Sequence, residues 1–242
     1  MEALILAAGY ATRLYPLTID KPKPLLEINK KPMIESILDK INSVKDIEMV
    51  FIITNHCFYE AFKFWLNNYI YSKKIILIND GSVNNEDRLG AVGDIDFVIK
   101  HQKINDDLLV IAGDNLFGFS LKKFVDFFYS KNTSIVAFHD LKNPDKVKGK
   151  YGVGILKETK VINFEEKPLF PQSALASTAC YIFKKEDLIH IHSLIKNQKA
   201  DAPGNLIKYL TEVSEVHGFI FDEHWFDIGT FESLEEAKKV YE

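Results

Sequence analysis

Apolar and polar positions follow two periods in the first half of the chain, and these periods predict its elements. Short continuous apolar runs are typical of buried strands, whereas apolar residues that recur every three or four positions indicate one face of a helix. The predicted strands are 3–8, 50–54, 75–78, 108–112 and 135–138, and the predicted helices are 33–41 (with Pro32 as first helical residue), 58–69, 91–99 and 121–128. This alternation predicts right-handed crossovers and a mostly parallel sheet with helices on both faces.

The pattern changes after residue 140. Short apolar segments at 152–156, 161–164 and 175–183 follow each other without long helices between them, which favours antiparallel pairing. Helices are predicted again at 186–196 and 205–212, then a strand at 216–221 and a last helix at 231–240. The prediction is one α/β domain over 1–242, in which about 140–184 form an inserted antiparallel lobe and about 185–242 return to the core.

Composition excludes several classes of protein. The chain has 242 residues, of which 26% are charged and 47% hydrophobic, and its net charge is −4. A nucleic-acid-binding protein normally has a basic face, so no nucleic-acid partner is expected. No apolar run has the length of a membrane span, and Glu2 lies where a signal peptide needs basic residues. Cys57 and Cys180 imply no disulfide framework, and a cytoplasmic protein without a membrane partner is predicted.

Phosphate chemistry is indicated directly after the first strand. Small residues lie at Gly9 and Ala11, Thr12 and Arg13 follow, and ten residues later Lys23 lies between two prolines. A sharp turn without bulky side chains brings backbone N–H groups close to phosphate oxygens, and two cations suit a polyphosphate. The segment contains neither the P-loop spacing nor the dinucleotide-binding spacing of glycines.

Residues 4–24 resemble the signature of the sugar-1-phosphate nucleotidylyltransferases, the nucleotide-sugar pyrophosphorylases that include glucose-1-phosphate thymidylyltransferase. That signature is approximately Leu-Ala-Gly-Gly-x-Gly-Thr-Arg-Leu-x-Pro-Leu-Thr, followed by Lys-Pro-Lys-Pro. Ala8 and Ala11 each replace a glycine of it. Alanine leaves the backbone accessible to phosphate, unless φ is positive at that position. The resemblance implies a Rossmann-like nucleotidyltransferase fold, with a nucleotide-binding part at about 1–139 and a sugar-binding lobe at about 140–184.

The same resemblance implies a set of nucleotide-binding residues. They are Leu6, Ala8, Gly9, Tyr10, Ala11, Thr12 and Arg13, together with Gly81 and Gly90 in the loop 79–90. This loop is expected to hold the base, but the glutamine that the family often uses for thymine or uracil is missing. Asn84, Asn85 or backbone groups of the two glycines are candidates, and a solvated loop explains the asparagines equally well.

Two aspartates lie where strands end. Asp114 follows the apolar run 108–112, and Asp227 ends a short aromatic segment before the last helix. Ligands of doubly wound sheets bind beyond the carboxyl ends of the strands, and Mg²⁺ bound with a triphosphate takes a few hard oxygen ligands from protein. The resemblance implies that both aspartates bind Mg²⁺. A turn residue and a helix cap are the alternatives.

The expected sugar site lies in the second lobe. Glu166 and Lys167 resemble the family's Glu-Lys-Pro element, in which the carboxylate contacts sugar hydroxyls and the ammonium contacts the sugar phosphate. Tyr151 and Gly152 resemble a Tyr-Gly-Val segment near the sugar. A charged hairpin tip and a β-bulge are the alternatives. The basic segment 142–150 is either a solvated loop or a mobile cover over the site.

Together with these residues, the resemblance implies Mg²⁺-dependent transfer of a nucleotidyl group from a nucleoside triphosphate, with dTTP or UTP favoured, to a sugar 1-phosphate. Arg13, Lys23 and Lys167 are the predicted catalytic residues, and they act by neutralising phosphate charge. A cytidylyltransferase that acts on phosphocholine and a non-catalytic nucleotide-sugar sensor are the alternatives. For the first, Tyr151, Phe164, Phe170 and Tyr181 are the aromatic candidates for a cage around a quaternary ammonium. The sugar, the base and the oligomeric state stay open.

Overall fold

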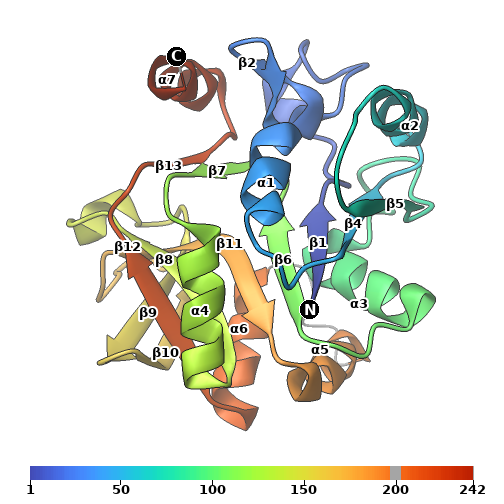
Figure 1. Cartoon of the computed structure of the whole chain (residues 1–242). Coiled ribbons are helices and arrows are strands. Elements are labelled where there is room, and N and C mark those ends of the chain that lie inside the picture. Colours follow the sequence, from blue (N-terminus) through green and yellow to red (C-terminus); the bar gives the residue numbers. More distant parts are fainter. Residues whose placement is uncertain (197–202, 242) are drawn as a thin grey trace.

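A nine-stranded sheet with helices on both faces organises the part of the chain described by the computed structural model, residues 1–196 and 203–241 (Figure 1). The strand order is β5-β4-β1-β6-β11-β8-β12-β10-β9. In that order the strands are Lys74–Asn79, Met49–Thr54, Glu2–Leu6, Leu108–Ala112, Leu175–Phe183, Ser134–Asp140, Val216–Phe221, Lys160–Glu166 and Gly152–Lys157. The predicted return segment 185–242 includes 197–202 and 242, which lie outside the described residues.

One half of the sheet is parallel. Strands β5, β4, β1 and β6 all run in the same direction, with Leu4 of β1 opposite Phe51 of β4 and Val110 of β6. Parallel neighbours need a crossover connection, and the helices supply it. The helices of this half are α1 (Met33–Asn42), α2 (Tyr59–Asn67) and α3 (Gly90–Gln102). The predicted alternation is confirmed here, although Pro32 is the N-cap of α1 instead of its first helical residue.

The other half of the sheet is mixed. Strand β11 is antiparallel to both β6 and β8, β12 is parallel to β8, and β10 and β9 continue the sheet with antiparallel pairing. Parallel pairing is therefore confined to β5-β4-β1-β6 and to β8-β12. The hairpin β9-β10 and the strand β11 follow each other without a crossover helix. Short connections of this kind allow only antiparallel pairing.

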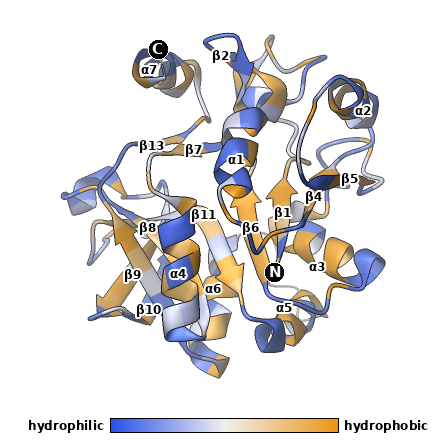
Figure 2. Ribbon diagram, viewed as in Figure 1, coloured by the Kyte–Doolittle hydropathy of each residue, from blue (hydrophilic) through white to orange (hydrophobic). Residues whose placement is uncertain are grey.

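Two apolar layers cover the two faces of the sheet. Strand residues such as Ile5 and Ile111 pack with α1, α2 and α4 (Leu121–Lys131) on one face. Their neighbours Leu4 and Val110 pack on the other face with α3, α5 (Leu188–Lys196) and α6 (Pro203–Val213). Successive strand residues point to opposite faces, so continuous apolar runs fit strands that are buried on both sides. Figure 2 shows these strands as hydrophobic and the helices as amphipathic.

Two small elements complete the edge of the sheet where the candidate site lies. Strand β7 (Asn115–Phe117) pairs antiparallel with β13 (Trp225–Asp227), and α7 (Phe231–Val240) follows. The hairpin of β2 (Glu27–Ile28) and β3 (Lys31–Pro32) precedes α1. Figure 1 places α7 and β2 near each other above β7 and β13. Among the described residues, no helix has the length and apolar character needed to cross a membrane.

Candidate active site

A pocket of about 420 Å³ opens at the carboxyl ends of β1 and β6. Strand β1 ends at Leu6, two residues before the predicted end, and the chain then turns into the segment 7–13, which we call the phosphate loop. Of the predicted nucleotide-binding residues, the lining includes Leu6, Ala8, Gly9, Tyr10, Ala11, Thr12, Arg13 and Gly90. Lys23 and Asp114 also line the pocket, whereas Gly81 is not among its lining residues.

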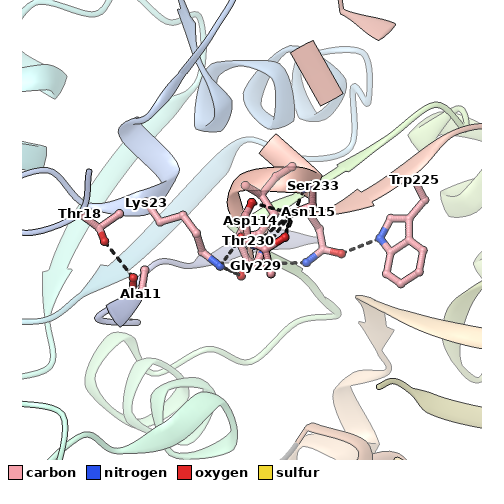
Figure 3. Close-up of polar contacts among 10 residues, drawn as sticks. Ala11, Thr18, Lys23, Asp114, Asn115, Trp225, Gly229, Thr230 and Ser233 are labelled. Atoms are coloured by element: carbon pink, nitrogen blue, oxygen red, sulfur yellow. Dashed lines mark hydrogen bonds and ion pairs between the residues drawn. The ribbon is translucent and has the colours of Figure 1, made fainter. Parts of the chain in front are cut away.

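The phosphate loop contains one strained residue. Ala11 has φ 48° and ψ 39°, the left-handed conformation that glycine adopts without penalty. Ala11, which replaces a glycine of the family signature, therefore has the positive φ that strains alanine. Its Cβ costs about 1–2 kcal/mol in this conformation. Thr18 Oγ1 donates to the Ala11 carbonyl at 2.8 Å and helps to hold this turn (Figure 3).

Lys23 joins three segments that are far apart in the sequence. Its Nζ donates to Asp114 Oδ2 at 2.5 Å and to the Ile228 carbonyl at 2.7 Å. The Ile228 N–H in turn donates to the Asp114 carbonyl at 3.1 Å. Desolvation raises the pKa of Asp114, but the Lys23 ammonium and hydrogen bonds from Lys23 and Asn115 outweigh it, so this pKa lies below its usual value. Asp114 is thus a carboxylate at neutral pH.

Asn115 and Trp225 orient Asp114. Asn115 Nδ2 donates to Asp114 Oδ1 at 2.8 Å, and Trp225 Nε1 donates to Asn115 Oδ1 at 2.6 Å (Figure 3). The indole holds the Asn115 amide so that its NH₂ group faces the carboxylate. This relay was not predicted, although Asn115 directly follows Asp114 and Trp225 begins the second aspartate segment.

Asp227 lies next to Asp114 because β13 pairs with β7. Asp227 is opposite Asn115 in this ladder. Its pKa is influenced by the charges of four residues, which are Asp114, Lys23, Arg13 and Lys167. Burial and the Asp114 carboxylate raise the pKa of Asp227 to about 6. Two mutually repelling carboxylates beside one ammonium form a place where additional positive charge is stabilised.

The pair Asp114 and Asp227 fits a hard divalent cation in its donor chemistry. Both side chains are carboxylates, and their repulsion is relieved when a cation binds between them. Within 1–196 and 203–241, no three His, Cys, Asp or Glu side chains form a group that could hold a metal. A cation at this place therefore needs most of its ligands from phosphates and water.

The predicted sugar-site residues lie together at the same side of the site. Gly152 pairs with Glu166 across β9 and β10, and the Lys167 N–H donates to the Tyr151 carbonyl at 3.2 Å. Lys167 Nζ is 3.9 Å from Glu166 Oε1, and its charge also acts on Asp227. None of these four residues is in the lining of the described pocket.

Gly204 lets Glu166 approach helix α6. A Cβ on Gly204 would clash directly with Glu166 Oε2, and a Cβ on Gly152 would lie 3.0 Å from the same oxygen. The carboxylate is thus held between two glycines, one of them in the first turn of α6, where backbone N–H groups and the helix dipole favour an anion. The sequence analysis did not find Gly204; the only signal was the Pro-Gly pair at the start of a predicted helix.

The pocket wall also contains residues that the sequence analysis did not select. Asn85 lines it, as foreseen for the loop 79–90, but Arg88 and Asp94 line it too. Asp94 lies inside α3, where an acidic residue in an apolar stripe was the available signal. Asn84 lines a neighbouring pocket that shares Tyr10 and Asn85 with the first.

Comparison with known proteins agrees with this geometry. The family model described as nucleotidyl transferase matches residues 2–242. The chain belongs to this family. Its sequence is 29% identical over 245 residues to the bifunctional protein GlmU of Methanocaldococcus jannaschii, covering 99% of this chain and 54% of that protein. It is 28% identical over 238 residues to the UTP–glucose-1-phosphate uridylyltransferase of Synechocystis sp., covering 95% of this chain and 60% of that protein.

The chain therefore spans between about half and three fifths of the length of these curated relatives. Solved structures show the same fold. A UDP-glucose pyrophosphorylase in complex with UDP-glucose matches with a TM-score of 0.83 and 21% identity, covering 99% of this chain and 97% of the other. A UTP-bound enzyme of the same kind from Acinetobacter baumannii matches with a TM-score of 0.81 and 18% identity, covering 99% and 92%. The predicted nucleotidyltransferase fold is confirmed.

Proposed function

We propose that this chain transfers a nucleotidyl group from a nucleoside triphosphate to a sugar 1-phosphate and releases pyrophosphate. The observation that carries this proposal is the convergence of Lys23, Asp114 and Asp227 beside the phosphate loop. These groups supply cationic and metal-binding chemistry at one end of a nucleotide-sized pocket. The names of the relatives in the same family agree with this reaction class.

The chemistry is an in-line displacement at the α-phosphorus. A phosphate oxygen of the sugar 1-phosphate forms the new P–O bond, and the bond to the β-phosphate breaks, so that pyrophosphate leaves with the electron pair. The attacking phosphate is already ionised and needs no general base. Catalysis then consists of alignment and of neutralising the charge that develops on the leaving group.

Each cation has a separate task in this proposal. Arg13, which lies against Gly229, binds the β- and γ-phosphates and stabilises the pyrophosphate. Lys23 neutralises charge beside it while it holds Asp114 in place. Lys167 positions the attacking phosphate, and Glu166 accepts hydrogen bonds from sugar hydroxyls. Asp114 and Asp227 would hold Mg²⁺, which supplies Lewis-acid charge neutralisation on the phosphates when bound.

Phosphocholine is a weaker candidate acceptor, because the aromatic residues foreseen for it are not all accessible. Phe164 and Tyr181 are buried in the core, which leaves Tyr151 and Phe170 near the surface of the lobe. A quaternary ammonium needs several aromatic faces around it. We therefore favour a sugar phosphate over phosphocholine, with dTTP or UTP as donor and the cytoplasm as compartment.

Pyrophosphate release tests this function. The protein is incubated with Mg²⁺, each nucleoside triphosphate and a panel of hexose 1-phosphates, with phosphocholine as the competing acceptor. Arg13→Ala is expected to lower kcat by about 10²- to 10³-fold, as other electrostatic deletions do. Lys21→Ala is the matched control, because Lys21 is exposed and pairs only with Glu27 among the described residues. Near-full activity of Arg13→Ala contradicts the mechanism, and no release with any acceptor favours a sensor.

A further inference from the structure

Two carboxyl groups lie together beside the pocket, and one of them lines it. Asp94 of α3 lines the pocket beside Gly90 and Ala91, and only 5% of its surface is exposed. Asp80 follows β5 directly and is 8% exposed. Buried acidic side chains are rare unless they are paired, so this juxtaposition needs a physical reason.

The two carboxyls are not equivalent. Asp80 is held by Ser82, whose N–H donates to Asp80 Oδ1 at 2.7 Å and whose hydroxyl donates to the same oxygen at 2.8 Å. The Asp80 and Asp94 side chains lie within hydrogen-bonding reach of each other. Asp94 Oδ1 is buried, and it has no hydrogen-bond partner in the described part of the chain. A buried acceptor without a partner is unfavourable, and a ligand that donates a hydrogen bond to it removes this cost.

A hydrogen bond between two carboxyls requires that one of them carries the proton. The carboxylate form of Asp80 is stabilised by two donors from Ser82, so Asp94 is the protonated partner. Burial and the neighbouring Asp80 charge raise the pKa of Asp94 to about 8, in agreement with this assignment. With its hydrogen directed at Asp80, Asp94 keeps Oδ1 as an acceptor that has no partner among the described residues.

The other residues of the pocket lining indicate that this acceptor contacts the base of a bound nucleotide. Arg13, Lys23 and Asp114 of the pocket lining suit phosphates, whereas Gly90, Ala91 and Asp94 of α3 line the same pocket with backbone groups and one carboxyl that can meet a base. We propose that Asp94 accepts a ring N–H of the base through Oδ1, and that Asp80 is the positioning residue that fixes this oxygen. This inference rests on the proposed function, because it assigns the nucleotide to this pocket.

The chemistry of the acceptor selects a class of bases. Uracil, thymine and guanine carry a ring N–H on their pairing edge, whereas cytosine and adenine carry a ring nitrogen lone pair there. A lone pair facing Asp94 Oδ1 is repelled, and no hydrogen is left to bridge the two atoms. The pocket therefore favours uridine, thymidine and guanosine nucleotides over cytidine and adenosine nucleotides.

Nucleotide affinities of protein variants, measured by calorimetry, test the proposal. The dissociation constants of UTP, dTTP, GTP, CTP and ATP are measured for the wild type and for Asp94→Leu, Asp94→Asn and Asp96→Asn. Asp94→Leu should weaken the tightest ring N–H nucleotide by about tenfold or more. Asp94→Asn should stay within about threefold of the wild type, since its NH₂ group donates to Asp80 and its carbonyl faces the pocket. Asp96→Asn is the matched control, because Asp96 is also buried in α3 but pairs with Lys100.

A modified ligand tests the same contact without a protein variant, in case Asp94→Leu does not fold. Methylation of the ring nitrogen, as in N3-methyl-UTP or N1-methyl-GTP, removes the N–H. The wild type should bind the methylated nucleotide at least about tenfold more weakly, and Asp94→Ala should bind both forms with similar affinity. Equal binding of both forms by the wild type, or tightest binding of CTP or ATP, overturns the proposal.

Failure of this inference differs from failure of the proposed function. Base-selective binding that depends on Asp94, without formation of a nucleotide sugar, overturns the function and leaves the contact in place. Robust pyrophosphate release with unchanged base selectivity in Asp94→Leu overturns the contact alone. Absence of binding by every nucleoside triphosphate overturns both.

Discussion

The Lys23 ammonium lies 2.5 Å from the Asp114 carboxylate and thereby fixes the protonation of this residue. Without Lys23, the neighbouring carboxylates of Asp114 and Asp227 would repel each other with no ammonium bonded to Asp114. Lys23 therefore has two tasks in the proposed reaction, since it neutralises phosphate charge and holds Asp114 in place.

Replacement of Lys23 by Met keeps the length of the side chain and removes its charge. We expect kcat to fall by about 10²- to 10³-fold. The ammonium also holds down the pKa of Asp114, so the optimum of activity should move to higher pH, where both aspartates ionise without it. The measurement is a pH–rate profile at saturating Mg²⁺, with Lys21→Met as control. An unchanged profile contradicts the assigned role.

Replacement of Ala11 by Gly should stabilise the protein. Ala11 has φ 48°, and removal of its Cβ relieves about 1 kcal/mol of backbone strain, partly offset by the larger entropy of an unfolded glycine. Urea unfolding measures the change in the free energy of unfolding. Ala8→Gly is the control, since Ala8 is not among the residues with positive φ, and it should destabilise. A loss of stability in Ala11→Gly contradicts the strained conformation.

Replacement of Gly204 by Ala should disturb sugar binding through Glu166. The added Cβ would clash with Glu166 Oε2, so the carboxylate must move away from the sugar. We expect the KM for the sugar 1-phosphate to rise by about tenfold, which corresponds to the loss of one hydrogen bond to a charged group, while the KM for the nucleotide stays unchanged. The shorter carboxylate of Glu166→Asp, combined with Gly204→Ala, should recover part of the loss. Equal effects on both substrates indicate a general packing defect instead.

Stability should depend on pH through Asp94. Its pKa is raised from 3.8 to about 8 in the folded protein, so the folded state binds this proton more tightly than the unfolded state. Its contribution is fully present below pH about 4 and is lost as the pH rises toward 8, with a slope of up to about 1.4 kcal/mol per pH unit.

Asp94→Asn removes this titration. The free energy of unfolding of Asp94→Asn minus that of the wild type should therefore grow between pH 5 and 8 in urea unfolding experiments. A constant difference between Asp94→Asn and the wild type would show that Asp94 does not titrate in this range.

Much of the local structure followed from the sequence. The strands Leu108–Ala112 and Val216–Phe221 and the helix Phe231–Val240 have the predicted bounds, because apolar runs and helical spacing act over a few neighbouring residues. Other predicted elements begin or end at different residues in the structure. Strand β1 stops at Leu6 and not at residue 8, since the small residues that follow turn into the pocket.

Contacts between segments that are distant in the sequence were harder to predict. The candidates Arg13, Asp114 and Asp227 came from local motifs, but the sequence did not reveal that Trp225 orients Asn115 or that Gly204 borders Glu166. Such relationships depend on strand register and helix packing, to which many weak contacts contribute together.

The sequence by itself determined the alternation of elements and the chemistry of the phosphate loop, because both depend on residues close together in the chain. The tertiary structure decided that the sheet is mixed, with β11 between β6 and β8, and that Asp227 lies beside Lys23 and Asp114. It also decided that Asp94 is buried beside Asp80, which raises the pKa of Asp94. A pKa and a binding pocket are properties of neighbours in space, and only the folded chain brings those neighbours together.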